Sequence, residues 1–321
     1  MKTQTKIWLI AATSLFLIGA ILFGGAMSML GWNFKKLSTV KYETNSFEIT
    51  ESFQNITVIG DTANVAFLPS EDGKVSVTCY TQKNTRHEVA VKDGTLEVKL
   101  DSVKKWYAYI GFDFDSPKIK IYLPAGAYAA LSVKNETGDI TIPKDFTFES
   151  MTLKASTGDV KNAASVAGDV QIKTSTGNIC VENISAGALE LSASTGKTTV
   201  SAVTCAGDVK LSVSTGKTIL NNLHCANLHS NGSTGSLSMQ NVIADGTFTI
   251  ERDTGNVKFD RCDAAEISVK TDTGNIKGTL LSEKVFIYKT DTGSVSLPET
   301  VTGGKCTLKT DTGDIKIDIQ K

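Results

Sequence analysis

The chain has few of the residues from which enzyme and metal sites are built. It holds three histidines in 321 residues, and aromatic side chains make up only 7% of it. None of its six cysteines forms a Cys-x-x-Cys pair, which excludes zinc ribbons and thioredoxin-like redox sites. No nucleotide-binding loop, HExxH helix or Ser-His-Asp set appears in the sequence. We therefore expect no enzyme and no cofactor.

An excess of charge of one sign is also missing. The chain has 33 basic and 34 acidic residues, for a formal net charge of −1. Nucleic-acid-binding domains carry a basic excess, and disordered chains combine high net charge with few apolar residues. The sequence therefore predicts a folded protein that binds no nucleic acid.

One long run near the N-terminus carries no charge, from Ile7 to Trp32. A helix of about 20 apolar residues crosses the hydrocarbon core of a membrane. The run is too long for the apolar region of a signal peptide and lacks an Ala-x-Ala cleavage site. We interpret residues 1–32 as a short tail and an uncleaved transmembrane signal anchor, followed by a tether over 33–44.

Lysines flank this run on both sides in nearly equal number, so charge alone leaves the orientation open. Long domains cross the membrane largely regardless of their charge. The sequence therefore favours a single-pass protein of the cell membrane with the bulk of the chain outside the cytoplasm.

The dipeptide Thr-Gly recurs at intervals of 19 or 20 residues. Its glycines are Gly138, Gly158, Gly177, Gly196, Gly216, Gly235, Gly255, Gly274, Gly293 and Gly313. Apolar residues follow two and four positions later, which is strand periodicity, and a second turn such as Ala206-Gly207 lies about ten residues farther on. A fixed period near 20 is typical of solenoids. Residues 131–321 therefore predict an all-β fold, a parallel β-solenoid of ten coils with two strands in each.

Residues 45–130 have strand-like runs and two Asp-Gly turns but no Thr-Gly period. We interpret them as an N-terminal β region that caps the solenoid.

In the repeats, the alternation of each strand predicts that the threonine of every Thr-Gly points inward and forms a ladder.

Two cysteines fall at the same phase of the repeat. Cys205 and Cys225 each lie nine residues after a Thr-Gly glycine, so we expect them to be stacked neighbours. The spacing of stacked strands permits a disulfide, and two buried thiols are the favoured alternative. The sequence does not decide between them.

The last four repeats carry Asp-Thr-Gly. The aspartates are Asp253, Asp272, Asp291 and Asp311, and the lysines two residues before three of them are Lys270, Lys289 and Lys309. Aspartic proteases need two such loops facing each other, whereas this tripeptide recurs in successive coils and indicates a turn variant. Stacking predicts a lysine ladder beside an aspartate ladder. A row of calcium ions is the alternative, although the calcium-binding Gly-Gly-x-Gly-x-Asp repeat is absent.

His224, Cys225 and His229 are the only cluster of soft metal ligands. The histidines are an odd number of residues apart, so a strand places them on opposite faces. This spacing argues against a metal site.

Two surfaces are candidates for binding a partner. The first is an aromatic strand that includes Trp106, Tyr107, Tyr109 and Phe112. It is either a strand of the core or an exposed hairpin that contacts a partner or the membrane. The second is the outward face of the coils, where Lys154 and Lys173 precede the lysines of the Asp-Thr-Gly repeats.

The segment GWNFKKLSTVKYET from Gly31, the entry strands and the tandem STGD, STGN and DTGD repeats are shared with a known family. Over nearly its whole length the chain resembles a bacterial adhesin-like domain family of unknown function, found among membrane-anchored proteins of Gram-positive envelope-stress loci. The resemblance implies a β-solenoid and defines no catalytic residues.

Two hypotheses for function follow. The first is a non-catalytic adhesion or binding module of the cell envelope that contacts a surface protein, a glycan or a cell-wall polymer. The second is a structural or regulatory envelope-stress membrane protein. It would act through protein contacts, including a homo-oligomer joined at solenoid ends, edge strands or the anchor helix.

Overall fold

The computed structural model describes residues 3–37, 41–83, 85–101 and 116–320. It begins with α1 (Thr3–Met29), an apolar helix with a mean hydropathy of 2.3, long enough to cross a membrane and packed against nothing over its most apolar stretch. A short 3-10 helix, η1 (Phe34–Leu37), follows. The predicted N-terminal apolar helix is confirmed, and such a helix is compatible with an anchor or a signal sequence.

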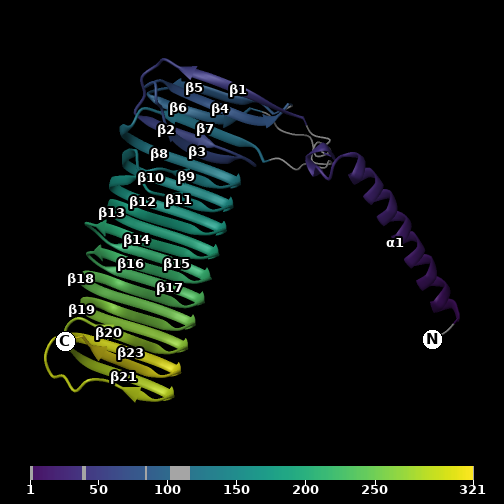
Figure 1. Ribbon diagram of the computed structural model, residues 1–321. Helices are drawn as coiled ribbons and strands as arrows, with labels where there is room; N and C mark the ends of the chain where they lie inside the picture. The colour runs from purple at the N-terminus through teal and green to yellow at the C-terminus, as the bar shows by residue number, and fades with distance from the viewer. Residues whose placement is uncertain (1–2, 38–40, 84, 102–115, 321) are drawn as a thin grey trace.

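All strands of the described residues join one continuous sheet that winds into a solenoid, as Figure 1 shows. The N-terminal strands are β1 (Tyr42–Ile49), β2 (Asn55–Ile59), β3 (Asn64–Pro69), β4 (Val75–Gln82), β5 (His87–Lys92), β6 (Thr95–Leu100) and β7 (Lys118–Leu123). The body contains β8 (Gly126–Thr137), β9 (Ile140–Ile142), β10 (Phe146–Thr157), β11 (Val160–Asn162), β12 (Ser165–Thr176), β13 (Ile179–Thr195), β14 (Thr198–Cys205), β15 (Val209–Thr215), β16 (Thr218–Cys225), β17 (Leu228–Thr234), β18 (Leu237–Thr254) and β19 (Val257–Thr273). The C-terminal strands are β20 (Ile276–Leu280), β21 (Lys284–Thr292), β22 (Val295–Ser296), β23 (Gly304–Thr312) and β24 (Ile315–Ile319). The predicted all-β solenoid of about ten turns is confirmed.

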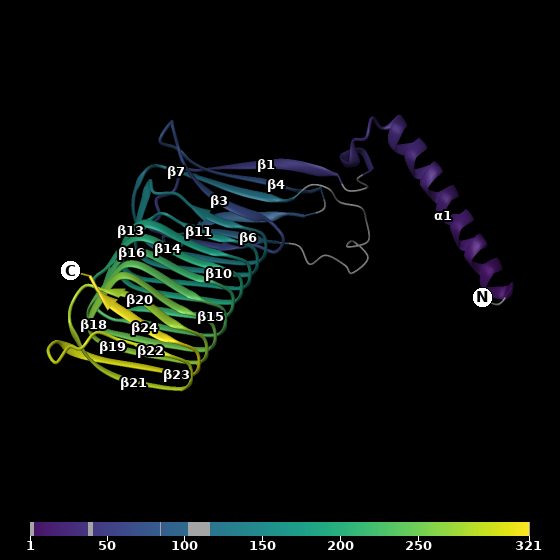
Figure 2. The ribbon, with the colours of Figure 1, turned by 60° about the horizontal axis from the view of Figure 1, so that its bottom comes forward.

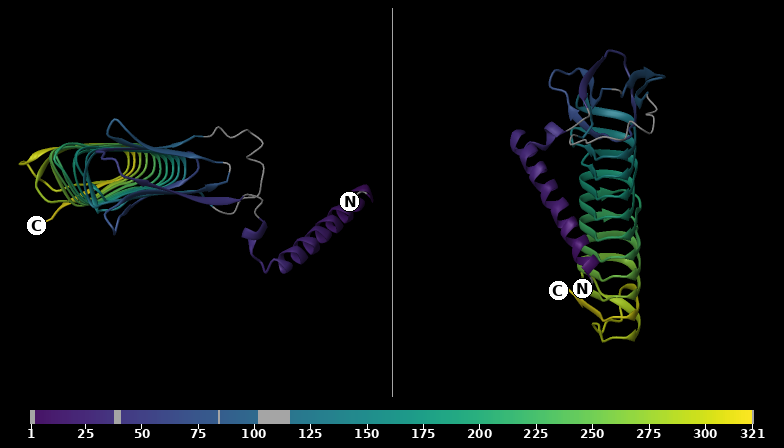
Figure 3. Two further views of the ribbon diagram at one scale, coloured as in Figure 1. Left: turned by 90° about the horizontal axis from the view of Figure 1, so that it is seen from above. Right: turned by 90° about the vertical axis from the view of Figure 1, so that its right-hand side faces the viewer.

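Each coil has two strand segments, one before its Thr-Gly and one after it. Successive coils stack in parallel and in register, so Leu191 lies beside Leu211, and Val200 lies beside Leu220. Alternate side chains of both segments point into one continuous apolar core that runs the length of the rod. Figure 3 shows the stacked coils that surround it. We call the outward side of the segments that precede Thr-Gly the long-strand face.

The Thr-Gly turns stack on one another because each glycine has a backbone that only glycine adopts freely. Gly216, for example, has φ +146° and sits against the carbonyl group of Gly196. The next position carries Asp or Asn in several coils, and its side chain accepts a hydrogen bond from the backbone N–H one coil on, as Asp159 does from Asn178 at 2.7 Å. This side-chain ladder explains the STGD and STGN repeats.

The predicted inward ladder of Thr-Gly threonines is wrong. Thr176 and its counterparts are exposed, because the last two residues of each segment both face outward and break the alternation. The inward threonine lies two residues earlier. Thr174 and Thr271 are buried, and each hydroxyl donates to the glycine carbonyl of the neighbouring coil at 3.2 Å.

The N-terminal end is closed by strands that run against the solenoid direction. β2 and β3 form a coil that stacks in parallel on β8 and β9, and β6 and β7 stack on that coil. β4 then pairs antiparallel with β7 and with β1, and β5 pairs antiparallel with β6. This arrangement covers the apolar core at that end (Figure 1).

The last two coils do not stack in chain order. β23 lies between β19 and β21, and β24 lies between β20 and β22. The final coil of the chain is therefore inserted between the coil that precedes it and the rest of the rod (Figure 2). The expected sequence-order stacking of the Asp-Thr-Gly repeats is corrected here. β24 pairs with all five residues of β20, whereas β22 has only two residues to offer. The inserted order therefore satisfies more backbone hydrogen bonds.

Polar side chains fasten the inserted coil to both neighbours. Asp314 accepts hydrogen bonds from the backbone N–H and the hydroxyl of Ser294 on one side, and from Lys277 at 3.0 Å on the other. These hydrogen bonds, the one from the Ser294 backbone first, lower the pKa of Asp314 to about 2. Lys284 of the last coil reaches past the inserted coil to Asp263, with 2.7 Å between Nζ and Oδ1.

Candidate functional site

The long-strand face carries one row of side chains that crosses every coil. In spatial order the row is Lys134, Lys154, Lys173, Ser192, Ser212, Asn231, Glu251, Lys270, Lys309 and Lys289. Parallel stacking places neighbours in such a row about 4.8 Å apart. The row therefore has two groups of three lysines, separated by uncharged and acidic side chains.

The first group, Lys134, Lys154 and Lys173, is the lysine triplet. Lys134 lies 3.8 Å from Glu136, and among the described residues Lys154 and Lys173 have no ion pair. The neighbouring positions toward the turn are Ser156 and Ser175, which bring hydroxyl groups and no negative charge. The triplet is therefore an exposed row of positive charge with one weak acidic partner.

Two lysines of the second group are paired with the aspartates of their own Asp-Thr-Gly turns. Lys270 Nζ lies 3.5 Å from Asp272, and Lys289 Nζ lies 3.1 Å from Asp291. The hydrogen bond to Asp291 raises the pKa of Lys289. This geometry favours the interpretation of paired ladders. The calcium hypothesis for these aspartates stays a prediction, and the described residues contain no cluster of three or more metal-ligating side chains.

The four Asp-Thr-Gly turns lie in one row. Their threonines are in register, Thr254 beside Thr273, then Thr312, then Thr292. The aspartates therefore project along one side of the rod and do not face one another, as two protease carboxylates must.

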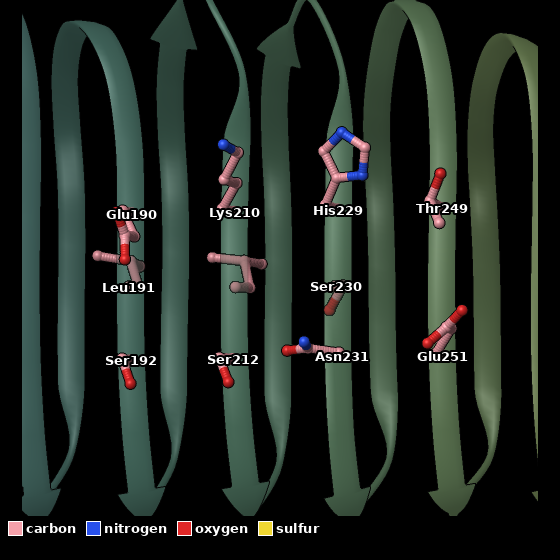
Figure 4. A pocket seen from close by; sticks show the side chains of 11 residues that line it. Glu190, Leu191, Ser192, Lys210, Ser212, His229, Ser230, Asn231, Thr249 and Glu251 are labelled. Atoms are coloured by element: carbon pink, nitrogen blue, oxygen red, sulfur yellow. The ribbon is translucent and has the colours of Figure 1, made fainter.

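Between the two lysine groups the face is hollowed into a shallow groove of about 450 Å³. Figure 4 shows its side chains on four neighbouring strands. The outward members are Glu190, Ser192, Lys210, Ser212, His229, Asn231, Thr249 and Glu251. A second hollow of about 650 Å³ adjoins it, shares Glu190 and Lys210, and extends toward the lysine triplet. The groove offers hydrogen-bond donors and acceptors, and both positively and negatively charged side chains line it. No Phe, Tyr or Trp side chain lines it.

A buried arginine beneath the groove was not recognised from the sequence. Arg252 points inward, where it donates to the Ser230 hydroxyl and to the Glu251 carbonyl, both at 2.8 Å. Desolvation lowers the pKa of its guanidinium to about 10, so it is still charged at neutral pH. Gly232 occupies the same inward position in the next coil and leaves room for the guanidinium. An alignment of the repeats would show Gly232 and Arg252 in successive coils at one inward position, which is small or apolar in the other coils.

The two histidines lie on different strands of their coil. His224 is on β16, where its Nε2 lies 3.1 Å from Asp245, and His229 is on β17 in the groove. They do not share a ligand position with Cys225, which is buried.

All six cysteines are free thiols, including Cys205 and Cys225, so the structure has the buried thiols and not the disulfide. Burial raises the pKa of Cys205 to about 11 and of Cys225 to about 12. Cys180 is the only cysteine that is not buried.

We predict that a thiol reagent will modify one cysteine rapidly in the native protein and all six after unfolding without reductant. The reason is that thiolates are the reactive species and five thiols are buried. Titration with a chromogenic disulfide reagent measures both numbers. Four thiols in the unfolded, unreduced protein would contradict this and indicate a disulfide.

The aromatic candidates Trp106, Tyr107, Tyr109 and Phe112 lie outside the described residues. The predicted lysines are placed together in one row by the solenoid, whereas Ser192, Lys210, Asn231 and Arg252 were not singled out by sequence reasoning.

Comparison with known proteins adds the family. A family model described as Toastrack DUF4097 matches residues 53–215 and 204–321. A "putative adhesin" from Bacteroides fragilis is 18% identical over 87% of this chain and 97% of its own, with a TM-score of 0.45. A "putative lipid binding protein" from Parabacteroides distasonis is 15% identical over 88% and 98%, with a TM-score of 0.47. A "putative adhesin" from Parabacteroides merdae is 14% identical over 87% and 96%, with a TM-score of 0.47. No curated protein matches the sequence. The chain belongs to the Toastrack DUF4097 family.

Proposed function

We propose that this protein is a membrane-anchored, extracytoplasmic and non-catalytic binding module of the bacterial cell envelope, and that its long-strand face binds an anionic polymer. The observation that carries the proposal is the lysine triplet, a row of positive charge with a single weak acidic partner. The apolar helix α1 supports the anchoring.

The spacing of the triplet favours a polymer over a single anion. Like charges about 4.8 Å apart repel by about 1 kcal/mol in water before salt screening. A ligand with repeated negative charges relieves both of these repulsions together, and its charges bind as one multivalent unit. A polyol-phosphate cell-wall polymer has this chemistry.

The groove supports binding without catalysis. Its acid and base side chains, Glu190, Lys210 and His229, stand in one row on adjacent strands of an open face. They do not converge on a point where a reacting atom could be held by a nucleophile and a base together. We infer that they contribute hydrogen bonds to the same extended ligand.

Binding should fall about 30-fold when Lys154→Ala and Lys173→Ala are combined, at about 1 kcal/mol for each lysine near an anionic surface. The measurement is titration of the full chain in detergent with a polyol-phosphate polymer at two salt concentrations. The matched control combines Lys270→Ala and Lys289→Ala in the same row, both of which are paired with an aspartate, and it should change affinity less than threefold. An equal loss in both double variants would overturn the assignment to the triplet.

The location is tested by labelling intact cells with a membrane-impermeant amine reagent. Exposed lysines such as Lys154 and Lys173 should react before lysis. Labelling only after lysis would overturn the extracytoplasmic placement.

The second hypothesis, a structural or regulatory component that acts through protein contacts, is favoured by one observation. Within the described residues, the coil that ends the rod, β21 and β22, has strands paired on one side only.

A further inference from the structure

The C-terminal end of the solenoid is an open edge in both of its sheets. β21 pairs only with β23, and β22 pairs only with β24, so within the described residues the other side of each strand has no neighbour. Unpaired strand edges are templates for pairing with another chain. Repeat proteins normally close such an end with a polar cap.

This edge exposes apolar side chains. Val285 is 40% exposed, Ile287 47%, Tyr288 55% and Val295 38%. From residue 126 to residue 280 no large apolar side chain is exposed. Tyr288 is in register with the buried Leu308, so it occupies a core position. Among the described residues no further coil stacks on it. The last coil therefore ends the rod with apolar side chains that are exposed at core positions.

The same edge is electrically balanced. Lys289 is paired with Asp291 at 3.1 Å, and Lys284 is paired with Asp263 at 2.7 Å. Lysines on an edge strand usually prevent pairing by repulsion, but these have their charge matched within the chain. Two copies of this end can meet without net repulsion.

We propose that two copies of this chain associate tail to tail through β21 and β22. A two-fold axis perpendicular to the sheets brings each edge antiparallel to its own copy, so both edges are satisfied at once. A single extended peptide would cover only one of them. The opposite end of the rod is no match, because its outer strands β1 and β5 have no exposed large apolar side chain.

The alternation of β21 selects a register. In the register that places Ile287 on the two-fold axis, Ile287 faces Ile287 of the second copy. Phe286 then faces Tyr288 of the second copy on the inward side of the strand. Aromatic and branched cross-strand pairs of this kind stabilise antiparallel sheets. The chain enters the rod through β1 at the end far from β21 (Figure 1), so the two entry points of the pair lie at opposite ends of the joined rods. Linking two facing membranes in this way rests on the proposed anchoring, whereas the dimer itself does not.

Cysteine cross-linking of the full chain in detergent tests the register. In a Cys180→Ser background, oxidised Ile287→Cys should run as a disulfide-linked dimer on a non-reducing gel. Antiparallel partners are about 4.5–5.5 Å apart between Cα atoms, within the range for a disulfide. Ser268→Cys lies in the same row two coils inward and should give at least tenfold less dimer. Val301→Cys, 90% exposed in a loop beside the edge, measures random collision.

Light scattering of the protein mass in the micelle gives an independent result. Ile287→Lys should yield monomer, and Ser268→Lys should yield dimer. The proposal is overturned if Ile287→Cys links no faster than Val301→Cys. It is also overturned if Ile287→Lys leaves a dimer, since the anchor helix would then hold the copies. Neither result depends on polymer binding. A failure of the dimer proposal is therefore distinguishable from a failure of the proposed polymer binding.

Discussion

Replacing Gly216 with alanine should lower the free energy of unfolding by about 3–5 kcal/mol, combining a strained backbone with an overpacked contact. The added Cβ would overlap the carbonyl oxygen of Gly196, and φ at this position is +146°. The clash cannot be relieved locally, because Gly216 is in turn covered by Gly235 of the next coil. The midpoint of chemical unfolding, followed by circular dichroism, measures the effect.

The control is Gly73→Ala. Gly73 also has a positive φ, +73°, but nothing lies within 4 Å of an added Cβ. Its cost should be about 1–2 kcal/mol, from backbone strain alone. Because each coil contacts only its neighbours, the Gly216 variant should also unfold less cooperatively than the wild type. Equal costs for the two variants would show that glycine stacking does not hold the turns together.

Asp263→Asn should destabilise the C-terminal coils by about 3–5 kcal/mol, since it leaves a buried lysine without its counter-charge. The Lys284 side chain is only 4% exposed, and its other polar partner is the Ser282 hydroxyl at 2.6 Å. Trypsin cleavage after Lys305 and Lys309, which the wild-type coil protects, should become much faster. The cleavage rate and the unfolding midpoint are the measurements.

A double-mutant cycle separates the ion pair from other effects. Asp263→Asn with Lys284→Met should recover most of the lost stability, because an apolar side chain of similar length replaces the buried charge. The exposed pair Lys270 and Asp272 is the control, and Asp272→Asn should cost less than about 1 kcal/mol. A double variant no more stable than Asp263→Asn alone would mean that the ion pair is not what fastens the last coil.

Much of the fold could be predicted because the sequence repeats its turn. The Thr-Gly glycines mark every coil, and the apolar positions after them alternate as strand residues do. The parity error at Thr176 shows the limit of alternation. Periodicity assumes a regular strand, whereas the last two residues before each Thr-Gly glycine both face the surface.

The candidate site was only partly predictable. Lys154, Lys173 and the later lysines were identified as outward residues, but their distance from an acidic partner could not be. The sequence already places Asp272 two residues after Lys270 and Ser156 two residues after Lys154. Only the stacking shows that Lys154 lies in one row with Lys134 and Lys173. Arg252 likewise needs Gly232 of the adjacent coil, 20 residues away, before its burial makes sense.

The sequence by itself determined the apolar N-terminal helix, the parallel solenoid, its period and, apart from the threonine of each Thr-Gly, which residues of each coil face outward. These properties depend on local chemistry, since turns and alternation are set within about 20 residues. Only the tertiary structure decided which coil ends the rod. Every coil presents nearly the same pattern to its neighbours, so the repeat cannot specify its own stacking order. The order follows from the hydrogen bonds that each candidate neighbour can complete, and the five-residue β24 fits β20 where the two-residue β22 does not.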